Sequence, residues 1–380
     1  MNDEEAVDLL ATMVRIPSVS GEEAELAGYL VESMGRLGFE AYVDKAGNAV
    51  GLIGEGVLLG VLLGHMDTVP GEIPVRVEGG RLHGRGAVDA KGPLAAFIAA
   101  ATRRWRAGSL PGRIAVVGCV EEEVPSSKGA HYAAACFRPS FCVVGEPSGW
   151  DGVALGYKGY LRALLRFEQD GGHPAHAGAT ICEHAVAAWG HLQQAADRWN
   201  EGRERIFDRI MLALRAMHSG DGGGQEWSEL SVDLRLPLDL SPEEAARWLQ
   251  RGVSGATIEF RGGLPAWAGR RTTRLHRLFA HSIIRRGGRM RYTLKTGTAD
   301  LNIVAPLWGC PALAYGPGDA ALDHTPGEYL RLTDYLRSIA VLEDVLGGCA
   351  SVVTANCHAV ATAAGPGSQE GVEAVRWKRN

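Results

Sequence analysis

Three short apolar runs constrain the fold of this chain more than any other feature. They cover residues 57–63, 114–120 and 141–144, and glycine or polar residues stand at their ends. Apolar runs without alternation suit strands that are buried on both faces of a sheet. Residues 94–105 predict an apolar helix between the first two runs, so strand, helix and strand alternate. The sequence therefore predicts an α/β fold, with a largely parallel sheet flanked by helices.

The length and the change of pattern along the chain predict two domains. At 380 residues the chain is longer than a single hydrophobic core usually supports. From about residue 160 the pattern becomes strand, helix, strand, strand, helix, strand, which predicts an inserted, ferredoxin-like α+β domain over residues 160–263. The main domain is then formed by residues 1–159 and 264–346. Residues 347–380 are rich in Ala, Gly and Ser, and we expect a disordered tail there.

Local signals predict the helices at the two ends of the main domain. Residues 4–15 read as a helix that stops before Pro17. Ser20 with Glu23 three positions later is a capping-box signal, which predicts a helix that runs to about Leu37. A last helix is expected near residues 328–346.

Composition excludes several classes of protein. Apolar residues make up 46% and charged residues 22% of the chain, as in globular enzymes. The acidic N-terminus does not resemble a signal peptide, and no apolar run approaches the roughly 20 residues that span a bilayer. The seven cysteines are never spaced as C-x-x-C. We therefore expect reduced thiols and a cytoplasmic protein that does not enter a membrane.

One segment is strongly basic although the net charge of the chain is -5. Taken alone, such a segment favours a solvated helix face over a binding site. Nucleic acid is not expected as a partner, because no aromatic residues are interleaved in the pattern of a binding module. The basic residues, which no acid interrupts, are Arg270, Arg271, Arg274, Arg277, Arg285, Arg286, Arg289, Arg291 and Lys295.

The pair Gly64-His65 directly follows the first apolar run. In open α/β sheets functional groups gather beyond the carboxyl ends of the strands, so His65 is a candidate metal ligand. Asp67, two residues later, is placed to accept the second imidazole N–H, as the histidine ligands of metals usually require. A lone histidine after a strand is more often structural, so this assignment depends on further ligands.

Carboxylates stand at matching places elsewhere in the chain. Asp89 ends a glycine-rich loop before the helix at 94–105, where an N-cap would be the alternative. Three successive glutamates, residues 121–123, close the second run. Because adjacent buried carboxylates repel one another unless a cation neutralises them, they favour a metal site. Glu146 ends the third run, and His324 lies just before the last helix.

Together these residues form a set of nitrogen and oxygen ligands. One aspartate that bridges two zinc ions, with one histidine and one glutamate completing each, would leave room for a shared water. Cobalt or manganese fits the same ligands. The candidate ligands are His65, Asp89, Glu123, Glu146 and His324.

The same motifs resemble a known enzyme family. GHMDTVP, GRGAVDAKGPLAA, VEEEVPSSKGA, GEPS, HPAHAG, KTGTADLN and DHTPGEYL are similar, in order, to those of acetylornithine deacetylase, succinyl-diaminopimelate desuccinylase and carboxypeptidase G. The resemblance implies a zinc-peptidase-like mixed sheet and a two-zinc amidohydrolase. It also implies that Asp89 bridges the metals and that His65 and His324 bind separate metals, each with Glu146 or Glu123. By the same resemblance, Glu122 is the general base and Asp67 supports the site.

The resemblance further implies a catalytic domain interrupted by a dimerisation domain. In such homodimers His176 would reach across the interface to the substrate carbonyl. Arg235 and the turn from Lys295 to Thr298 resemble binders of a substrate carboxylate. The chain departs from the family pattern in having Ala299 where serine is common and His184 where asparagine is common.

The substrate is expected to be an amino acid bound to a carrier. The connection over residues 67–85 and the motifs GYKG and KTGTAD are most similar to the branch that releases lysine or ornithine from an amino-group carrier protein. That carrier is expected to be small and acidic, so the arginine-rich segment would steer it to the enzyme. Acetylornithine and succinyl-diaminopimelate stay open as alternative substrates. A non-catalytic binding module is disfavoured, because every ligand is present.

Overall fold

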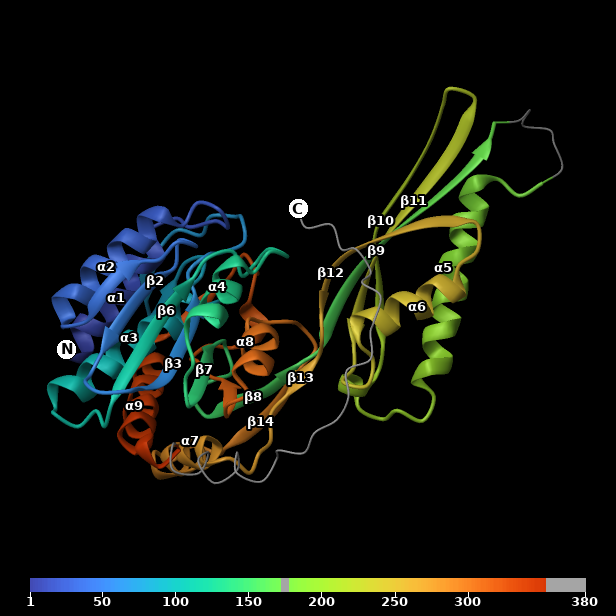
Figure 1. Ribbon diagram of the computed structural model, residues 1–380. Helices are drawn as coiled ribbons and strands as arrows, with labels where there is room; N and C mark the ends of the chain where they lie inside the picture. The colour runs from blue at the N-terminus through green and yellow to red at the C-terminus, as the bar shows by residue number, and fades with distance from the viewer. Residues whose placement is uncertain (172–177, 353–380) are drawn as a thin grey trace. The chain divides into compact units, whose positions relative to one another are not determined.

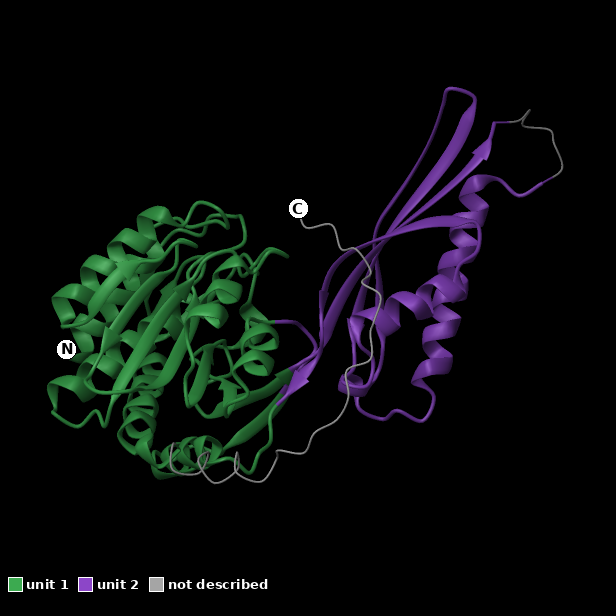
Figure 2. Cartoon of the chain, viewed as in Figure 1, with its two compact units in different colours: residues 1–156, 269–293, 299–366 green, residues 157–268, 294–298, 367–380 purple. Residues whose placement is uncertain are grey.

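The computed structural model describes residues 1–171 and 178–352, which form two compact units (Figure 2). Unit 1 comprises Met1–Gly156, Gly269–Thr293 and, among the described residues, 299–352. Unit 2 comprises Tyr157–Ala268 and Leu294–Thr298. The segment expected to form an inserted domain, 160–263, lies within unit 2. His176 and the residues from 353 onward lie outside the described residues.

Unit 1 is built on a mixed sheet with the order β1-β2-β6-β3-β7-β15-β8, and β14 pairs with β8. The four middle strands, β6, β3, β7 and β15, run parallel, whereas β1, β2 and β8 are antiparallel to their neighbours. The three apolar runs of the sequence become β3, β6 and β7, so the predicted α/β fold is confirmed. The strands are β1 (Glu40–Val43), β2 (Ala49–Ile53), β3 (Leu58–His65), β6 (Arg113–Cys119), β7 (Phe141–Gly145), β8 (Gly152–Tyr157), β14 (Arg291–Lys295) and β15 (Ala312–Ala314).

Helices cover both faces of this sheet. Figure 1 shows α1, α2, α3 and α9 on one side and α4 and α8 on the other. Helix α3 is almost wholly buried, in agreement with its apolar sequence. The helices are α1 (Asp3–Arg15), α2 (Ala24–Leu37), α3 (Lys91–Arg106), α4 (Lys128–Cys136), α7 (Arg274–Arg285), α8 (Leu301–Trp308) and α9 (Leu332–Gly348), with a short 3-10 helix at Ala320–Leu322.

The predicted capping box before α2 is wrong. Glu23 occupies the N-cap position, but no side chain caps this helix. The hydroxyl of Ser20 instead donates a hydrogen bond to Asp67 at 2.7 Å. The carboxylate of Glu23 accepts one from the backbone N–H of Glu121 at 3.0 Å. Both polar side chains therefore bind loops at the carboxyl end of the sheet, and these distant contacts replace the local ones.

The start of the last helix also differs from the prediction. Residues 329–331 form strand β16 (Tyr329–Arg331), so α9 begins only at Leu332. Strand β16 belongs to a small antiparallel sheet with the order β16-β5-β4, where β4 is Arg76–Glu78 and β5 is Arg81–His83. Pairing with a strand from the first quarter of the chain overrides the helical signal of this segment.

Unit 2 consists of one antiparallel sheet and two helices. Its strands have the order β10-β11-β9-β12, and the chain runs β9, α5, β10, β11, α6, β12. Every second residue of β9 and β11 is buried in a common apolar core with α5 and α6. The elements are β9 (Gly159–Asp170), α5 (Ile181–Asn200), a 3-10 helix (Ile206–Asp208), β10 (Met211–Gly222), β11 (Gln225–Leu236), α6 (Pro242–Gly252), β12 (Ala256–Leu264) and β13 (Trp267–Ala268).

The cysteines and the helices can be compared with what composition predicts about thiols and membranes. The cysteines of the described residues are all free, and Cys119, Cys142, Cys310 and Cys349 are buried. Among residues 1–171 and 178–352, no helix combines the length and the apolar character needed to cross a membrane.

Candidate metal centre

Four of the predicted site residues lie at the carboxyl ends of the parallel strands of unit 1. His65 is the last residue of β3, Glu122 and Glu123 follow β6, and Glu146 follows β7. Parallel neighbours end at the same edge of a sheet, so residues from three separate segments meet there. The sequence predicts this meeting because each apolar run ends in a potential ligand.

Asp89 lies between two histidines. Its Oδ1 is 3.1 Å from His65 Nε2, and its Oδ2 is 3.1 Å from His324 Nε2. His324 Nε2 is also 2.9 Å from Glu123 Oε1. Ligand atoms of His65, Asp89 and Glu123 all lie within 4.8 Å of one another, which makes these residues a candidate metal site. One carboxylate that reaches two imidazoles through separate oxygens is suited to bridge two cations.

The charges of this cluster depend strongly on one another. Burial opposes ionisation of Asp89, yet hydrogen bonds with His324 and His65 hold the pKa of its carboxyl well below the usual range. The hydrogen bond with Asp89, followed by that with Glu123, raises the pKa of His324 to about 10. Without a bound cation, the imidazolium of His324 therefore neutralises part of the acidic cluster.

Two further glutamates line the site, of which Glu146 is buried and Glu122 is half-buried. Burial raises the pKa of Glu122 well above its ordinary value. Burial, and then the nearby charge of Asp89, does the same for Glu146. Oε1 of Glu146 is buried and has no hydrogen-bond partner among the described residues. A buried acceptor of this kind is costly to leave unpaired, so the cluster fits a cation.

Asp67 holds the loop that carries the glutamates. Its carboxylate accepts hydrogen bonds from the backbone N–H groups of Glu122 at 3.1 Å and of Glu123 at 3.0 Å. The imidazole Nδ1 of His65 lies 3.0 Å from the backbone oxygen of Asp67 and 3.4 Å from its carboxylate. The backbone of Asp67 therefore orients His65, while its side chain fixes the turn after β6.

Glu328 is a site residue to which sequence analysis gave no role. Its buried carboxylate accepts hydrogen bonds from the backbone N–H groups of Val88 at 2.9 Å and Asp89 at 3.3 Å. Arg85 forms an ion pair with it at 2.9 Å. Glu328 thus ties the loop of Asp89 to the segment of His324. The only sequence signal was an acidic residue four positions after a candidate ligand.

The backbone around the site adopts unusual conformations. Glu121 and His324 have φ values of 58° and 59°, in the left-handed region that residues other than glycine rarely enter. Such strained residues concentrate at functional sites, where the surrounding structure holds them in place.

The predicted substrate-binding residues lie in unit 2. The guanidinium of Arg235 donates a hydrogen bond to the hydroxyl of Thr298 at 3.1 Å and lies 5.0 Å from the centre of the Tyr160 ring. The backbone oxygen of Lys295 accepts a hydrogen bond from Lys158. Arg235 and Thr298 are therefore brought together, although they are 63 positions apart in the chain.

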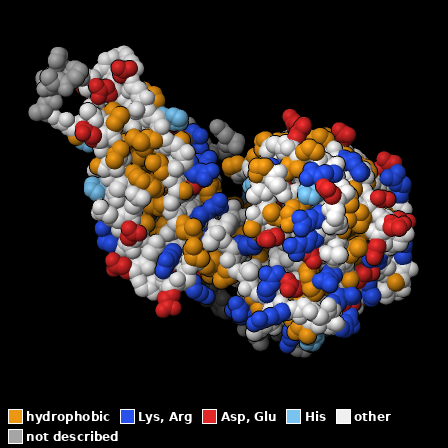
Figure 3. Space-filling view, turned by 180° about the vertical axis from the view of Figure 1, so that it is seen from behind, with side chains coloured by type: hydrophobic (Ala, Val, Ile, Leu, Met, Phe, Trp, Pro, Cys, Tyr) orange, Lys and Arg blue, Asp and Glu red, His pale blue; other side chains and the backbone are white. Residues whose placement is uncertain are grey.

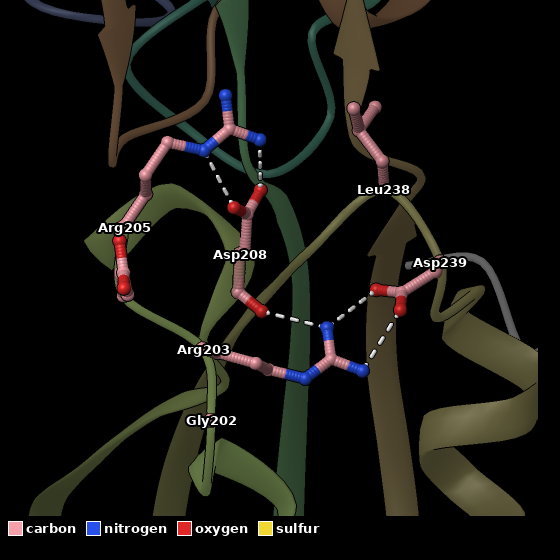
Figure 4. A pocket seen from close by; sticks show the side chains of 7 residues that line it. Gly202, Arg203, Arg205, Asp208, Leu238 and Asp239 are labelled. Atoms are coloured by element: carbon pink, nitrogen blue, oxygen red, sulfur yellow. Dashed lines mark hydrogen bonds and ion pairs between the residues drawn. The ribbon is translucent and has the colours of Figure 1, made fainter.

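A hollow of about 560 Å³ in unit 2 contains none of the predicted site residues (Figure 4). Four of the charged residues that line it are already paired. Arg203 forms two hydrogen bonds with Asp239, and Arg205 forms two with Asp208 (Figure 4). The hollow is therefore not a candidate site.

The arginine-rich segment forms α7 and its flanks. Several of its charges have partners: Arg285 and Arg286 pair with Asp344, and Arg291 pairs with Asp151. Figure 3 shows Lys and Arg side chains mixed with Asp and Glu over the visible face of unit 1.

Comparison with known proteins identifies the family. Residues 61–347 match the family described as peptidase family M20/M25/M40. The chain belongs to this family. It is a hydrolase. Its candidate metal centre lies at the carboxyl ends of β3, β6 and β7. The LysW-lysine hydrolase of Deinococcus radiodurans is 45% identical over 347 residues, which cover 90% of this chain and 96% of the relative.

Two further proteins agree with this assignment. A Thermococcus kodakarensis protein, named as a candidate LysW-lysine/LysW-ornithine hydrolase, is 39% identical over 91% of this chain and 92% of its own. The M20 family metallo-carboxypeptidase Sso-CP2 from Sulfolobus solfataricus superimposes with a TM-score of 0.75 at 18% identity. That superposition covers 91% of this chain and 99% of the carboxypeptidase, and it supports the fold.

Proposed function

We propose that this hydrolase cleaves the amide that joins lysine to the side-chain carboxyl of the C-terminal glutamate of an amino-group carrier protein. The observation that carries the proposal is the 45% identity to the LysW-lysine hydrolase over nearly the full length of both chains. The products are the free amino acid and the carrier, so the reaction is a late step of lysine biosynthesis. Ornithine, and with it arginine biosynthesis, is the second choice because another relative is named for both amino acids. The cytoplasm is the proposed compartment.

The proposed cofactor is a pair of zinc ions, with cobalt or manganese as alternatives. Asp89 is the proposed bridging ligand, because its two oxygens contact two different histidines. His65 and His324 serve separate metals, and Glu123 and Glu146 complete the set. When bound, such ions supply Lewis acidity that lowers the pKa of water and polarises an amide carbonyl.

Glu122 is the proposed general base. Desolvation raises the pKa of its half-buried carboxyl above the ordinary value, which favours a group that takes up a proton during the reaction. It takes a proton from the attacking water and later returns that proton to the nitrogen of the leaving amine, as the C–N bond breaks. Asp67 supports this role by holding the backbone of Glu122.

Arg235, Thr298 and Lys295 are the proposed binders of the carboxylate of the amino acid. A guanidinium that already donates to a hydroxyl offers its remaining N–H groups to such an anion. His176, outside the described residues, is proposed to act on the substrate carbonyl of a partner subunit. A homodimer through unit 2 is supported by β10, which is an edge strand of its sheet and carries the exposed side chains of Leu214 and Met217.

The test is a comparison of kcat/KM for four substrates. These are carrier-linked lysine, carrier-linked ornithine, N-acetylornithine and N-succinyl-diaminopimelate, each at low and high salt. We expect carrier-linked lysine to be cleaved fastest, with a rate that falls as salt rises. If N-acetylornithine is cleaved best, the carrier proposal is rejected.

A further inference from the structure

The small sheet β16-β5-β4 of unit 1 has one face that is buried over β16 and β5, although Val77 of β4 on that side is exposed, and one exposed face. Leu82 and Leu330 are fully or almost fully buried and stand opposite each other in the register. The side chains that alternate with them point the other way, because successive residues of a strand face opposite sides. We call this exposed surface the basic face; its residues are Arg76, Glu78, Arg81, His83, Tyr329 and Arg331.

The basic face combines positive charge with an aromatic ring. Arg81 and Arg331 are opposite each other in the register, and both are exposed. The guanidinium of Arg81 lies 4.6 Å from the centre of the Tyr329 ring, and the ring of His83 lies 5.4 Å from it. Arg76 pairs with Glu78. Among the described residues, no carboxylate lies within 4.0 Å of the guanidinium of Arg81 or Arg331. The nearest acidic influences are Glu78, which stands opposite Arg81 in the register and pairs with Arg76, and Asp334, whose carboxyl feels the charge of Arg331.

The basic face is linked through the chain to the candidate metal centre. Strand β5 leads directly into the loop that carries Asp89, and β16 directly follows Glu328, which binds that loop. Leu330, on the buried face of the small sheet, packs against Gly92 at the start of α3. The small sheet and the loop of Asp89 are therefore tied together within unit 1.

We propose that the basic face binds an acidic stretch of the polypeptide that carries the scissile amide. Two unpaired guanidiniums beside an aromatic ring complement carboxylates on an extended chain. A chain whose own net charge is -5 repels an acidic partner except where it presents such a face. This inference rests on the proposed function, because it assumes that the amide is attached to a polypeptide.

The arginine-rich segment is less suited to this role. Its α7 side chains Arg285 and Arg286 are held by Asp344, whereas both central arginines of the basic face lack such partners. Arg270 precedes α7, Arg277 lies on it, and both are exposed. These two arginines therefore supply a matched control. A charge reversal at those two positions changes the net charge as much as one on the basic face.

The experiment uses the metal-loaded enzyme and two synthetic peptides. Both end in a glutamate whose side chain is amide-linked to lysine; one has aspartates and glutamates before it, and the other has serines. For Arg81→Glu/Arg331→Glu we expect kcat/KM on the acidic peptide to fall about tenfold, mainly through KM. The serine peptide should be affected less than about twofold, and Arg270→Glu/Arg277→Glu should resemble the wild type on both.

Two other measurements distinguish an effect on docking from an effect on folding. A third outcome tests the proposed reaction itself. Binding of the fluorescent acidic peptide to Glu122→Gln enzyme should weaken in the basic-face variant and in about 0.5 M salt. Arg81→Gln/Arg331→Gln, which disturbs the fold less, should show a smaller loss in the same direction. Equal losses on both peptides, or no loss on the acidic peptide, overturn the docking proposal. If the wild type cleaves neither peptide, the proposed function itself is rejected.

Discussion

The carboxylate of Glu328 accepts a hydrogen bond from the backbone N–H of Asp89 at 3.3 Å. Asp89 is the residue on which both histidines of the candidate metal centre converge. The same carboxylate binds the N–H of Val88 and the guanidinium of Arg85. The position of Asp89 therefore depends on a residue 239 positions away in the chain.

Replacing Glu328 by alanine should weaken metal binding by about 10- to 100-fold, because the loop of Asp89 loses its support. Titration of the metal-free protein with zinc, followed by calorimetry, measures this. Glu328→Gln keeps a carbonyl oxygen for the two N–H groups, so its affinity should lie between those of the alanine variant and the wild type. Unchanged zinc affinity in Glu328→Ala would show that the contact does not position the ligand.

Glu122→Gln should lower kcat by about 10²- to 10⁴-fold, because an amide cannot take the proton of water. Its metal content, measured by elemental analysis, should equal that of the wild type. Glu121→Gln is the matched control, since Glu121 bonds to Ser126 at 2.6 Å and approaches Lys128 instead. If the two variants kept equal activity, another residue would have to be the base.

Removal of metal by a chelator should abolish activity and lower the Tm, because the buried carboxylates then lose the cation that binds the folded state. Adding back zinc, cobalt or manganese one at a time, while following Tm and activity, ranks the metals. Asp89→Asn should show a much smaller rise of Tm on metal addition. An equal rise in that variant would mean that the stabilising metal binds elsewhere.

His276 should make the protein less stable in acid. It is buried in α7, and burial, followed by the charge of Arg271, lowers its pKa to about 4. The unfolded chain takes up a proton near the ordinary value of about 6.5, whereas the folded protein does not. Stability from this residue is thus complete above about pH 6.5 and is lost progressively as the pH falls from there to about 4, by an amount on the order of 3 kcal/mol.

Urea unfolding at about pH 7 and about pH 4.5 measures this effect. The loss of stability between the two should be smaller in His276→Asn than in the wild type. His281→Asn, on the same helix at an exposed position, should lose as much as the wild type. Equal losses in all three proteins would exclude His276 as the source.

The strands were predictable from the sequence because their burial leaves a local trace. An uninterrupted apolar run such as residues 57–63 has few alternatives, and the residue after it must lie at the strand end. The convergence of Asp89 with His324 was expected because both stand before predicted helices and complete a set of metal ligands, and the resemblance to a family supported it. Its geometry, with one oxygen toward each histidine, required the structure.

The failures of prediction come from contacts between residues that are distant in the chain. Ser20 and Glu23 have the spacing of a capping box, but their side chains reach Asp67 and the backbone of Glu121 instead. Spacing alone does not reveal such competing distant partners. Tyr329 was assigned to a helix because its strand is only three residues long and pairs with the distant His83.

Strand β15 lies between β7 and β8, although it follows the whole of unit 2 in the chain. During synthesis on the ribosome, β7 emerges long before the strand that pairs with it. At usual rates of elongation the wait between Val144 and its partner Ala314 lasts roughly 10 to 30 seconds. Throughout that interval one edge of the nascent sheet is open to pairing with other chains, so this protein depends on protection of that edge while it is being made.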